Sequence, residues 1–248
     1  MTPTDSEETM IPQRTSPPAP GRLLLIRHAQ TQCTVEGRFC GAHDATLTAT
    51  GETMARHLAG HPALDGIDLV LSSPATRARA TAERLTRGTG KYEVDDRLRE
   101  LSFGAWESKK PSDLHGDERY ESWKRNPALH CPPGGESGLE VAARVVAAVR
   151  DALERSREVA VVTHKAPVRL AACFLLGIPL SRYRDLAAAP VGSVTELTFD
   201  QDHVRLRGLG DVSHLPPEWR RNPDGSGPGP APSGSSSPRE HPAPEHVR

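Results

Sequence analysis

The sequence predicts an α/β fold, a three-layer α/β/α sandwich with a mostly parallel central sheet. Short apolar runs rich in β-branched residues alternate along the chain with segments of helical periodicity. The apolar runs show little alternation of polar and apolar residues, as expected for strands buried on both faces. The middle of the chain is long enough to bury one substantial core.

The first half of the core begins with a predicted strand at 22–26, Arg-Leu-Leu-Leu-Ile. Thr48 is a suitable N-cap for a helix that reaches Leu58. A second strand is predicted at 67–71. Ser73 as N-cap, followed by Pro74 at the first helical position, predicts that a helix toward Leu85 begins there.

In the second half, Ser137 and Glu140 have the spacing of a capping box and predict the start of a long helix. Its predicted apolar face contains Leu139, Ala142, Ala143, Val146, Val149 and Leu153. Four further elements follow: a buried strand at 159–163, a helix at 167–176 ended by Gly177, and a closing pair of strands at 194–199 and 203–206.

The two ends of the chain differ from the middle in composition. Residues 1–20 are rich in Thr, Ser, Pro and acidic residues, and residues 216–248 are rich in Pro, Gly and Ser. Such segments bury too little apolar surface to offset the entropy of ordering. We therefore expect disordered tails at 1–20 and 216–248, and one folded domain at 21–215.

Charge and cysteine content limit the classes of function. The chain has 31 Lys and Arg against 32 Asp and Glu, which gives no electrostatic argument for a nucleic-acid or membrane partner. No apolar run approaches the ~18–20 residues that span a bilayer, and the opening stretch lacks a leader pattern. The 4 cysteines show no metal-ligand spacing. We expect a cytoplasmic protein without a bound metal.

Basic and imidazole side chains follow three of the predicted strands. Arg27 and His28 come directly after the first strand, Arg77 follows the second, and His164 follows the third. The carboxyl ends of parallel strands lie at one edge of the sheet, where ligands bind in such folds. Guanidinium groups match phosphate oxygens, and a neutral imidazole can attack phosphorus. The sequence therefore predicts a site for phosphoryl chemistry at this edge.

Residues 27–31, Arg-His-Ala-Gln-Thr, resemble the RHG signature of the histidine phosphatase superfamily, also called phosphoglycerate-mutase-like. Further segments resemble the motifs of that family in the same order. The segment at 98–107 is typical of its broad-specificity and α-ribazole phosphatase branch. The further segments are GRFCGAHDATLTATG at 37–51, LSSPATRARATA at 71–82, LRELSFGAWE at 98–107, PGGES at 133–137 and VTH at 162–164. The resemblance covers residues 23–206.

The resemblance implies a two-step phosphoryl transfer through a phosphohistidine, with no cofactor. His28 would attack the phosphorus, and Arg27, Arg77 and His164 would hold the phosphate oxygens. Glu100 would donate a proton to the leaving group and then activate water. Glu107, seven residues further along, is an alternative proton donor.

The sequence departs from the family pattern at several positions near the site. Ala29 replaces the usual glycine of the signature, which would be strained if the position needed a positive φ. Thr34 stands where many members have a phosphate-binding Asn, and Arg38 either contacts phosphate or braces the loop. Lys165 replaces part of a small, glycine-rich turn. It either binds a second anionic group on the substrate or points to solvent.

Three functions remain open. The first is a metal-independent phosphomonoesterase acting on a small phosphorylated metabolite. The second is a phosphoglycerate-type mutase, although only about thirty residues separate Trp106 from Ser137, where mutases carry a longer insertion. The third is a decayed binding or scaffold protein, which would normally have lost a catalytic residue. Substrate choice is expected to depend on the basic and aromatic loop at 103–135. A homodimer is compatible with such folds.

Overall fold

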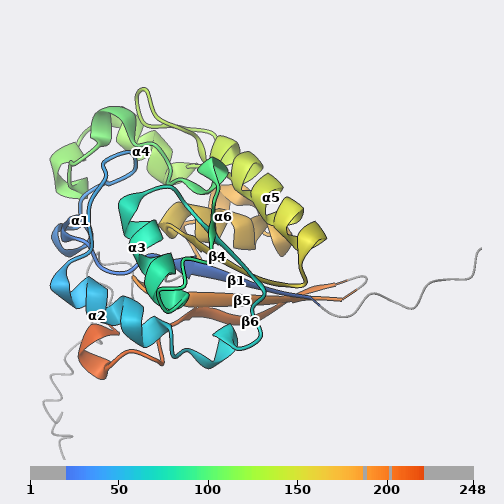
Figure 1. The fold of residues 1–248 in the computed structure, drawn as a ribbon. Helices are drawn as coiled ribbons and strands as arrows, with labels where there is room; N and C mark the ends of the chain where they lie inside the picture. Colours follow the sequence, from blue (N-terminus) through green and yellow to red (C-terminus); the bar gives the residue numbers. More distant parts are fainter. Residues whose placement is uncertain (1–20, 187–188, 201–202, 221–248) are drawn as a thin grey trace, which may run out of the picture.

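The computed structural model describes residues 21–186, 189–200 and 203–220 (Figure 1). The predicted tail at 1–20, and the predicted tail beyond residue 220, lie outside the described residues. Residues 216–220, which were assigned to the C-terminal tail, instead continue the fold. They include a 3-10 turn at Pro217–Trp219, and Trp219 packs against the cluster that contains Met54 and Leu215.

A six-stranded sheet forms the centre of the molecule, in the order β3-β2-β4-β1-β5-β6. The strands are β1 (Gly21–Arg27), β2 (Leu69–Ser72), β3 (Glu93–Val94), β4 (Glu158–Thr163), β5 (Val194–Phe199) and β6 (Val204–Asp211). The pairs β3-β2, β2-β4 and β4-β1 are parallel, while β5 runs antiparallel to both β1 and β6. The prediction of a mostly parallel sheet with a closing antiparallel pair is confirmed.

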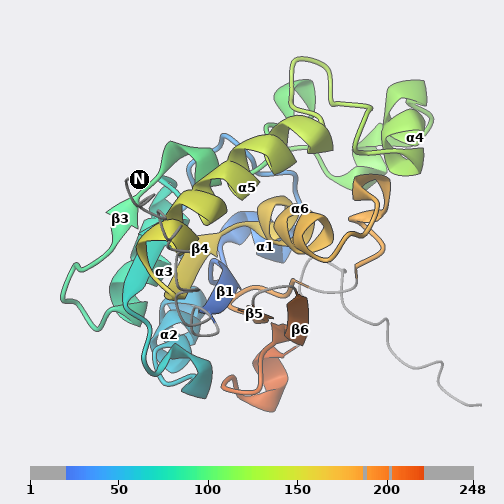
Figure 2. The same cartoon turned by 90° about the vertical axis from the view of Figure 1, so that its right-hand side faces the viewer.

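Helices cover both faces of this sheet, so the predicted three layers are present (Figures 1 and 2). On β1, Leu23 and Leu25 pack with α5 (Gly138–Arg155) and α6 (Lys165–Leu175), while Leu24 and Ile26 face α2 (Ala49–Leu58) and α3 (Thr76–Leu85). Successive side chains of a strand point to opposite faces, and both faces here are apolar. This explains why the predicted strands are continuous apolar runs.

The start of α3 differs from the prediction. The helix begins at Thr76 rather than next to Ser73, because a distant residue caps it. The Asp44 carboxylate accepts hydrogen bonds from the Thr76 backbone N–H at 2.8 Å and from the Thr76 hydroxyl at 2.5 Å. Ser73 instead bonds His164. Local cap signals in the sequence could not reveal a cap that comes from thirty-two positions upstream.

The other helix boundaries are closer to expectation. Thr48 caps α2, and Ser137 with Glu140 forms the predicted capping box of α5. The buried face of α5 is rotated from the predicted one, since Leu139 and Ala143 are exposed. Helix α6 begins at Lys165, before the predicted start at Pro167. A proline is tolerated in the first turn of a helix, where its missing N–H would have no intrahelical partner.

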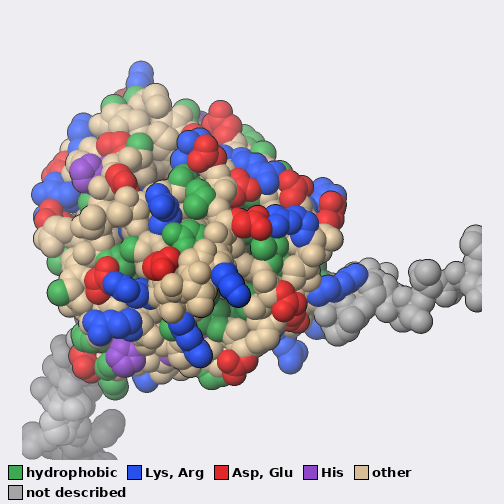
Figure 3. All heavy atoms as spheres, in the orientation of Figure 1, with side chains coloured by type: hydrophobic (Ala, Val, Ile, Leu, Met, Phe, Trp, Pro, Cys, Tyr) green, Lys and Arg blue, Asp and Glu red, His purple; other side chains and the backbone are tan. Residues whose placement is uncertain are grey.

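The remaining elements are short and lie mostly above the carboxyl ends of the parallel strands. They comprise α1 (Gln32–Glu36), α4 (Glu118–Arg125) and 3-10 turns at Pro62–Leu64, Asp96–Leu98, Gly104–Trp106, Pro111–Leu114 and Leu180–Arg182. Both signs of charge are interspersed over the face shown in Figure 3. Within residues 21–186, 189–200 and 203–220, no helix is long and apolar enough to cross a membrane.

Candidate active site

The three strand ends meet as predicted. In the register of the sheet, Arg27 pairs with Thr163, and Ser72 pairs with Val162. The backbone N–H of His28 donates to the Thr163 carbonyl at 2.9 Å, which extends the pairing one residue beyond β1. His28 and His164 therefore lie next to each other, with ring centroids 5.1 Å apart.

One contact sets the tautomer of His28. Its Nδ1 lies 2.7 Å from the carbonyl oxygen of Ala29, an acceptor that requires a proton on Nδ1. The lone pair of the neutral ring is then on Nε2. Ala29 itself is fully buried, and it is not among the non-glycine residues with positive φ. The alanine in place of glycine is therefore accommodated without the backbone strain considered from the sequence.

His164 is not itself among the residues that line the cavity, but its ring lies next to that of His28, which does. Its Nε2 is 2.7 Å from the Ser73 hydroxyl, and the side chain is fully buried. Burial lowers the pKa of His164 well below its ordinary value, and the charges of Arg77 and Arg27 act in the same direction. The ring is therefore neutral at neutral pH. Among the described residues, its Nδ1 has no hydrogen-bond partner, so this nitrogen can still form a hydrogen bond with a ligand.

Arg27 and Arg77 carry the positive charge of the site. Both are almost completely buried and both line the cavity. Arg77 donates to the backbone carbonyls of His43 at 2.9 Å and of Cys40 and Gly41 at 3.1 Å each. Arg27 donates to the Ala189 carbonyl at 2.7 Å. The carbonyl acceptors orient both guanidinium groups without contributing a negative charge of their own.

Glu100 lies on the cavity wall against the first turn of α6. Its carboxylate accepts hydrogen bonds from the backbone N–H groups of Leu101 at 2.9 Å, Lys165 at 3.1 Å and Ala166 at 3.3 Å. Burial raises the pKa of the Glu100 carboxyl, outweighing these bonds and the charges of Arg77 and Arg27, which act the other way. A raised pKa favours the protonated form of the carboxyl, which is the form that a proton donor requires.

Glu107, the alternative proton donor, is placed differently. It is not among the residues that line the cavity. Its carboxylate oxygens accept hydrogen bonds from the backbone N–H groups of Gly41, Ala42 and Phe103, each at 3.0 Å. These contacts join the loop that holds Arg77 to the loop that follows Glu100.

The three remaining predicted site residues, Thr34, Arg38 and Lys165, all line the cavity. The Thr34 hydroxyl donates to the Thr31 carbonyl at 2.8 Å and accepts from the Thr31 N–H, as part of the capping box of α1. Arg38 is exposed, pairs with Glu36 and donates to the Ser108 carbonyl at 2.9 Å, so it braces the loop. Lys165 is half-buried at the start of α6.

The cavity has a volume of about 400 Å³. Aromatic residues form one wall, namely Phe39, Phe103, Tyr120, Trp123 and Tyr183. Two further cations, Arg169 and Arg184, line it together with Lys165, and the Arg184 guanidinium lies 4.4 Å from the centre of the Trp123 ring. Within the described part of the chain, no group of three or more His, Cys, Asp or Glu residues is arranged to hold a metal ion.

Comparison with known proteins agrees with this geometry. The family model of the histidine phosphatase superfamily (branch 1) matches residues 23–212. The chain belongs to the histidine phosphatase superfamily. A Hydrogenobacter thermophilus protein named as a phosphoserine phosphatase is 32% identical over 198 residues, covering 78% of this chain and 97% of that protein.

Two other relatives carry different names. A Salmonella paratyphi B protein named as a phosphoglycerate mutase is 31% identical over 206 residues, covering 78% of this chain and 94% of its own. The solved structure of a mycobacterial glucosyl-3-phosphoglycerate phosphatase superposes with a TM-score of 0.70 at 28% identity, covering 78% of this chain and 100% of that one. The phosphatase and mutase names thus both occur within this superfamily.

Sequence reasoning missed Arg169, Tyr183 and Arg184 as cavity residues. Arg169 follows Lys165 by four positions on α6, so the two lie on the same side of the helix, and that spacing could have indicated it. Tyr183 and Arg184 come after the turn at Leu180–Arg182, where no sequence pattern indicates which way the chain folds.

We expect Glu107→Ala to act on stability. The substitution leaves three backbone N–H groups without their acceptor, so the free energy of unfolding should fall by about 1–3 kcal/mol. Urea denaturation measures this change. Glu100→Gln should instead retain most of the stability and lower kcat by about 100-fold. A Glu107→Ala variant of unchanged stability but lost turnover would return Glu107 to the role of proton donor.

Proposed function

We propose that the protein is a metal-independent phosphomonoesterase that acts through a covalent phosphohistidine on His28. One observation carries the proposal: an imidazole with its lone pair on Nε2 lies beside two buried arginines and a carboxyl group of raised pKa in one cavity. This set contains the nucleophile, the charge stabilisation and the proton donor that phosphoryl transfer needs.

In the first step, Nε2 of His28 attacks the substrate phosphorus and the bond to the leaving oxygen breaks. Arg27 and Arg77 stabilise the charge on the equatorial oxygens, since both guanidinium groups are already oriented by backbone carbonyls. The neutral His164 ring can donate from Nδ1 to a phosphate oxygen. Glu100 gives its proton to the leaving alkoxide.

In the second step, water replaces the leaving group in the same position. Glu100, now ionised, takes a proton from the water as it attacks the phosphohistidine. The N–P bond breaks, inorganic phosphate forms, and His28 regains its neutral ring. The three backbone N–H groups that contact the Glu100 carboxylate hold its ionised form between the two steps.

The hydrolase is favoured over the two alternatives. The segment between Trp106 and Ser137 is short. Its aromatic residues pack against one another in a cluster with Leu114, so little of the segment remains to cover the phosphohistidine. Water can then reach the intermediate, which a mutase must prevent. A decayed scaffold is disfavoured because His28, Arg27, Arg77 and His164 are all present and close together.

We infer further that the substrate carries a second anionic group. Lys165, Arg169 and Arg184 add positive charge to the cavity beyond the two arginines assigned to phosphate. Phosphoserine and phosphoglycerate, the compounds in the names of the relatives, each have a carboxylate besides the phosphate. Lys165 directly follows His164 in the sequence, and it is the proposed partner of the second anionic group.

The cellular setting and assembly of the protein stay predictions. The cysteines Cys33, Cys40, Cys131 and Cys173 are free thiols, in keeping with the reducing cytoplasm expected from the sequence. Either a monomer or a homodimer can carry the mechanism above, since every proposed catalytic group comes from one chain.

Phosphate release from a panel of phosphomonoesters, measured with a chelator present, tests the proposed function. We expect turnover of at least one small alkyl phosphomonoester, and loss of that turnover in His28→Ala. Including 3-phosphoglycerate in the panel separates hydrolysis from isomerisation to 2-phosphoglycerate. Isomerisation without phosphate release would support the mutase, and no reaction with any compound would support the scaffold.

The pH dependence of the rate of phosphohistidine formation should report the protonation of Glu100. The protonated carboxyl is the active form in the first step, so its rate should fall as pH rises through the raised pKa of Glu100. Phosphohistidine formation from an alkyl phosphomonoester, followed by rapid quenching across the pH range, measures this limb. Glu100→Gln should abolish it. An unchanged limb in that variant would contradict the assignment.

Lys165→Ala tests the second anionic group. With 3-phosphoglycerate, kcat/KM should fall by about 10-fold, the size of one charge-assisted hydrogen bond. With glycerol 3-phosphate, which lacks the carboxylate, the loss should be less than about twofold. Lys109→Ala, an exposed lysine outside the cavity, is the matched control and should change neither value. Equal losses on both substrates would refute the role of Lys165.

A further inference from the structure

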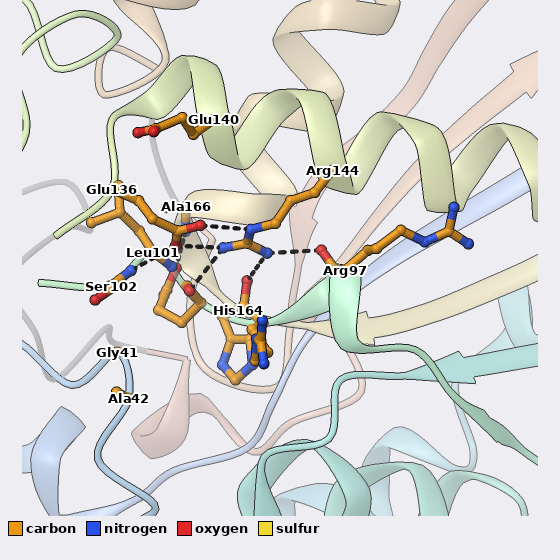
Figure 4. A network of polar contacts seen from close by, with 12 residues as sticks. Gly41, Ala42, Arg97, Leu101, Ser102, Glu136, Glu140, Arg144, His164 and Ala166 are labelled. Carbon is orange, nitrogen blue, oxygen red and sulfur yellow. Dashed lines mark hydrogen bonds and ion pairs between the residues drawn. The ribbon is translucent and has the colours of Figure 1, made fainter.

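Arg144, on α5, does not line the cavity, yet its guanidinium contacts the loop that carries Glu100 (Figure 4). Nη1 donates to the Arg97 carbonyl at 2.7 Å and to the Arg99 carbonyl at 2.6 Å. Nη2 donates to the carbonyl of Glu100 itself at 2.9 Å. One side chain thus holds three backbone carbonyls of the same short loop.

Glu136 completes the arrangement from the other side of Glu100. Its carboxylate accepts from Arg144 Nε and Nη2, each at 2.9 Å. It also accepts from the Ser102 backbone N–H at 2.9 Å, and the Glu136 N–H donates to the Ser102 carbonyl at the same distance. The ion pair therefore fixes the chain both before and after Glu100.

The geometry uses the whole hydrogen-bonding capacity of the guanidinium. Arginine has five N–H donors in a rigid plane, and these five bonds occupy all of them. Lysine, with three donors, cannot make the same set. The Leu98 carbonyl, the one in this stretch that Arg144 does not reach, accepts from the Thr163 hydroxyl at 2.6 Å, next to His164.

From these contacts we propose that Arg144, together with Glu136, positions Glu100 for proton transfer to the leaving oxygen. The inference rests on the function proposed above. The four backbone carbonyls of residues 97–100 accept hydrogen bonds from side chains of α5 and β4, namely Arg144 and Thr163. Proton transfer needs a donor within hydrogen-bond reach of the leaving oxygen, and a shift of about 1 Å can cost about 100-fold in rate.

Leaving-group dependence distinguishes this role from a general contribution to folding. An alkoxide needs a proton to leave, whereas p-nitrophenolate leaves without one. In Arg144→Gln, the rate of phosphohistidine formation in a single turnover should fall about 100-fold with the best alkyl phosphomonoester of the panel. With p-nitrophenyl phosphate it should fall less than about threefold. The same selectivity is expected for Glu100→Gln.

Three further variants control the experiment. Arg155→Gln removes another two-bond ion pair of α5, to Glu93, that does not contact this loop, and should change neither rate. Arg144→Lys should recover only part of the loss with the alkyl ester. Glu136→Gln should show the same selectivity as Arg144→Gln, and decides the question if Arg144→Gln does not fold.

Equal losses on both substrates in the folded variants, or no loss on either, would overturn the role of Arg144 while leaving the proposed function intact. If the wild-type protein forms no phosphohistidine from either substrate, the proposed function fails and the inference fails with it. The two failures are therefore distinguishable in one set of measurements.

Discussion

Parallel pairing of β1 with β4 places His28 beside His164, because the two strands end at the same level of the sheet. The apolar residues of both strands are packed on both faces, so a shift of either strand by one residue would exchange the side chains between the two faces and disrupt the packing of both. The relation between the two rings is thus maintained by the hydrophobic core rather than by contacts within the site. The other residues of the proposed active site are brought to this fixed pair by loops.

Two of those loops are held by arginines through backbone carbonyls. Arg77 binds the carbonyls of the loop at Cys40–His43, and Arg144 binds those of the loop around Glu100. The loops touch each other at Gly41, where a Cβ would lie 2.2 Å from the Leu101 carbonyl oxygen. Only glycine permits this approach. The residues proposed for charge stabilisation and for proton donation are therefore coupled through the packing of these two loops.

Much of the site could be predicted from the sequence because its main residues follow apolar strands. Arg27 ends one such strand, and His28 and His164 directly follow such strands. The continuous apolar runs of the sequence located both strands correctly. What could not be predicted depends on contacts between distant segments. Asp44 caps α3 from a loop before α2, and Arg184 reaches the cavity through an irregular turn. Which of Glu100 and Glu107 is the better candidate for proton donor likewise depends on which of the two side chains faces the cavity. Their spacing along the chain does not indicate this.

His28 is proposed to accept the phosphoryl group on Nε2, and isolation of the covalent intermediate tests this role. The protein would be quenched after brief reaction with a phosphomonoester, and the modified residue identified by mass spectrometry under alkaline conditions that preserve phosphohistidine. We predict one acid-labile phosphoryl group on His28, absent from His28→Ala. A phosphoryl group on another residue, or turnover with no covalent intermediate, would contradict the account.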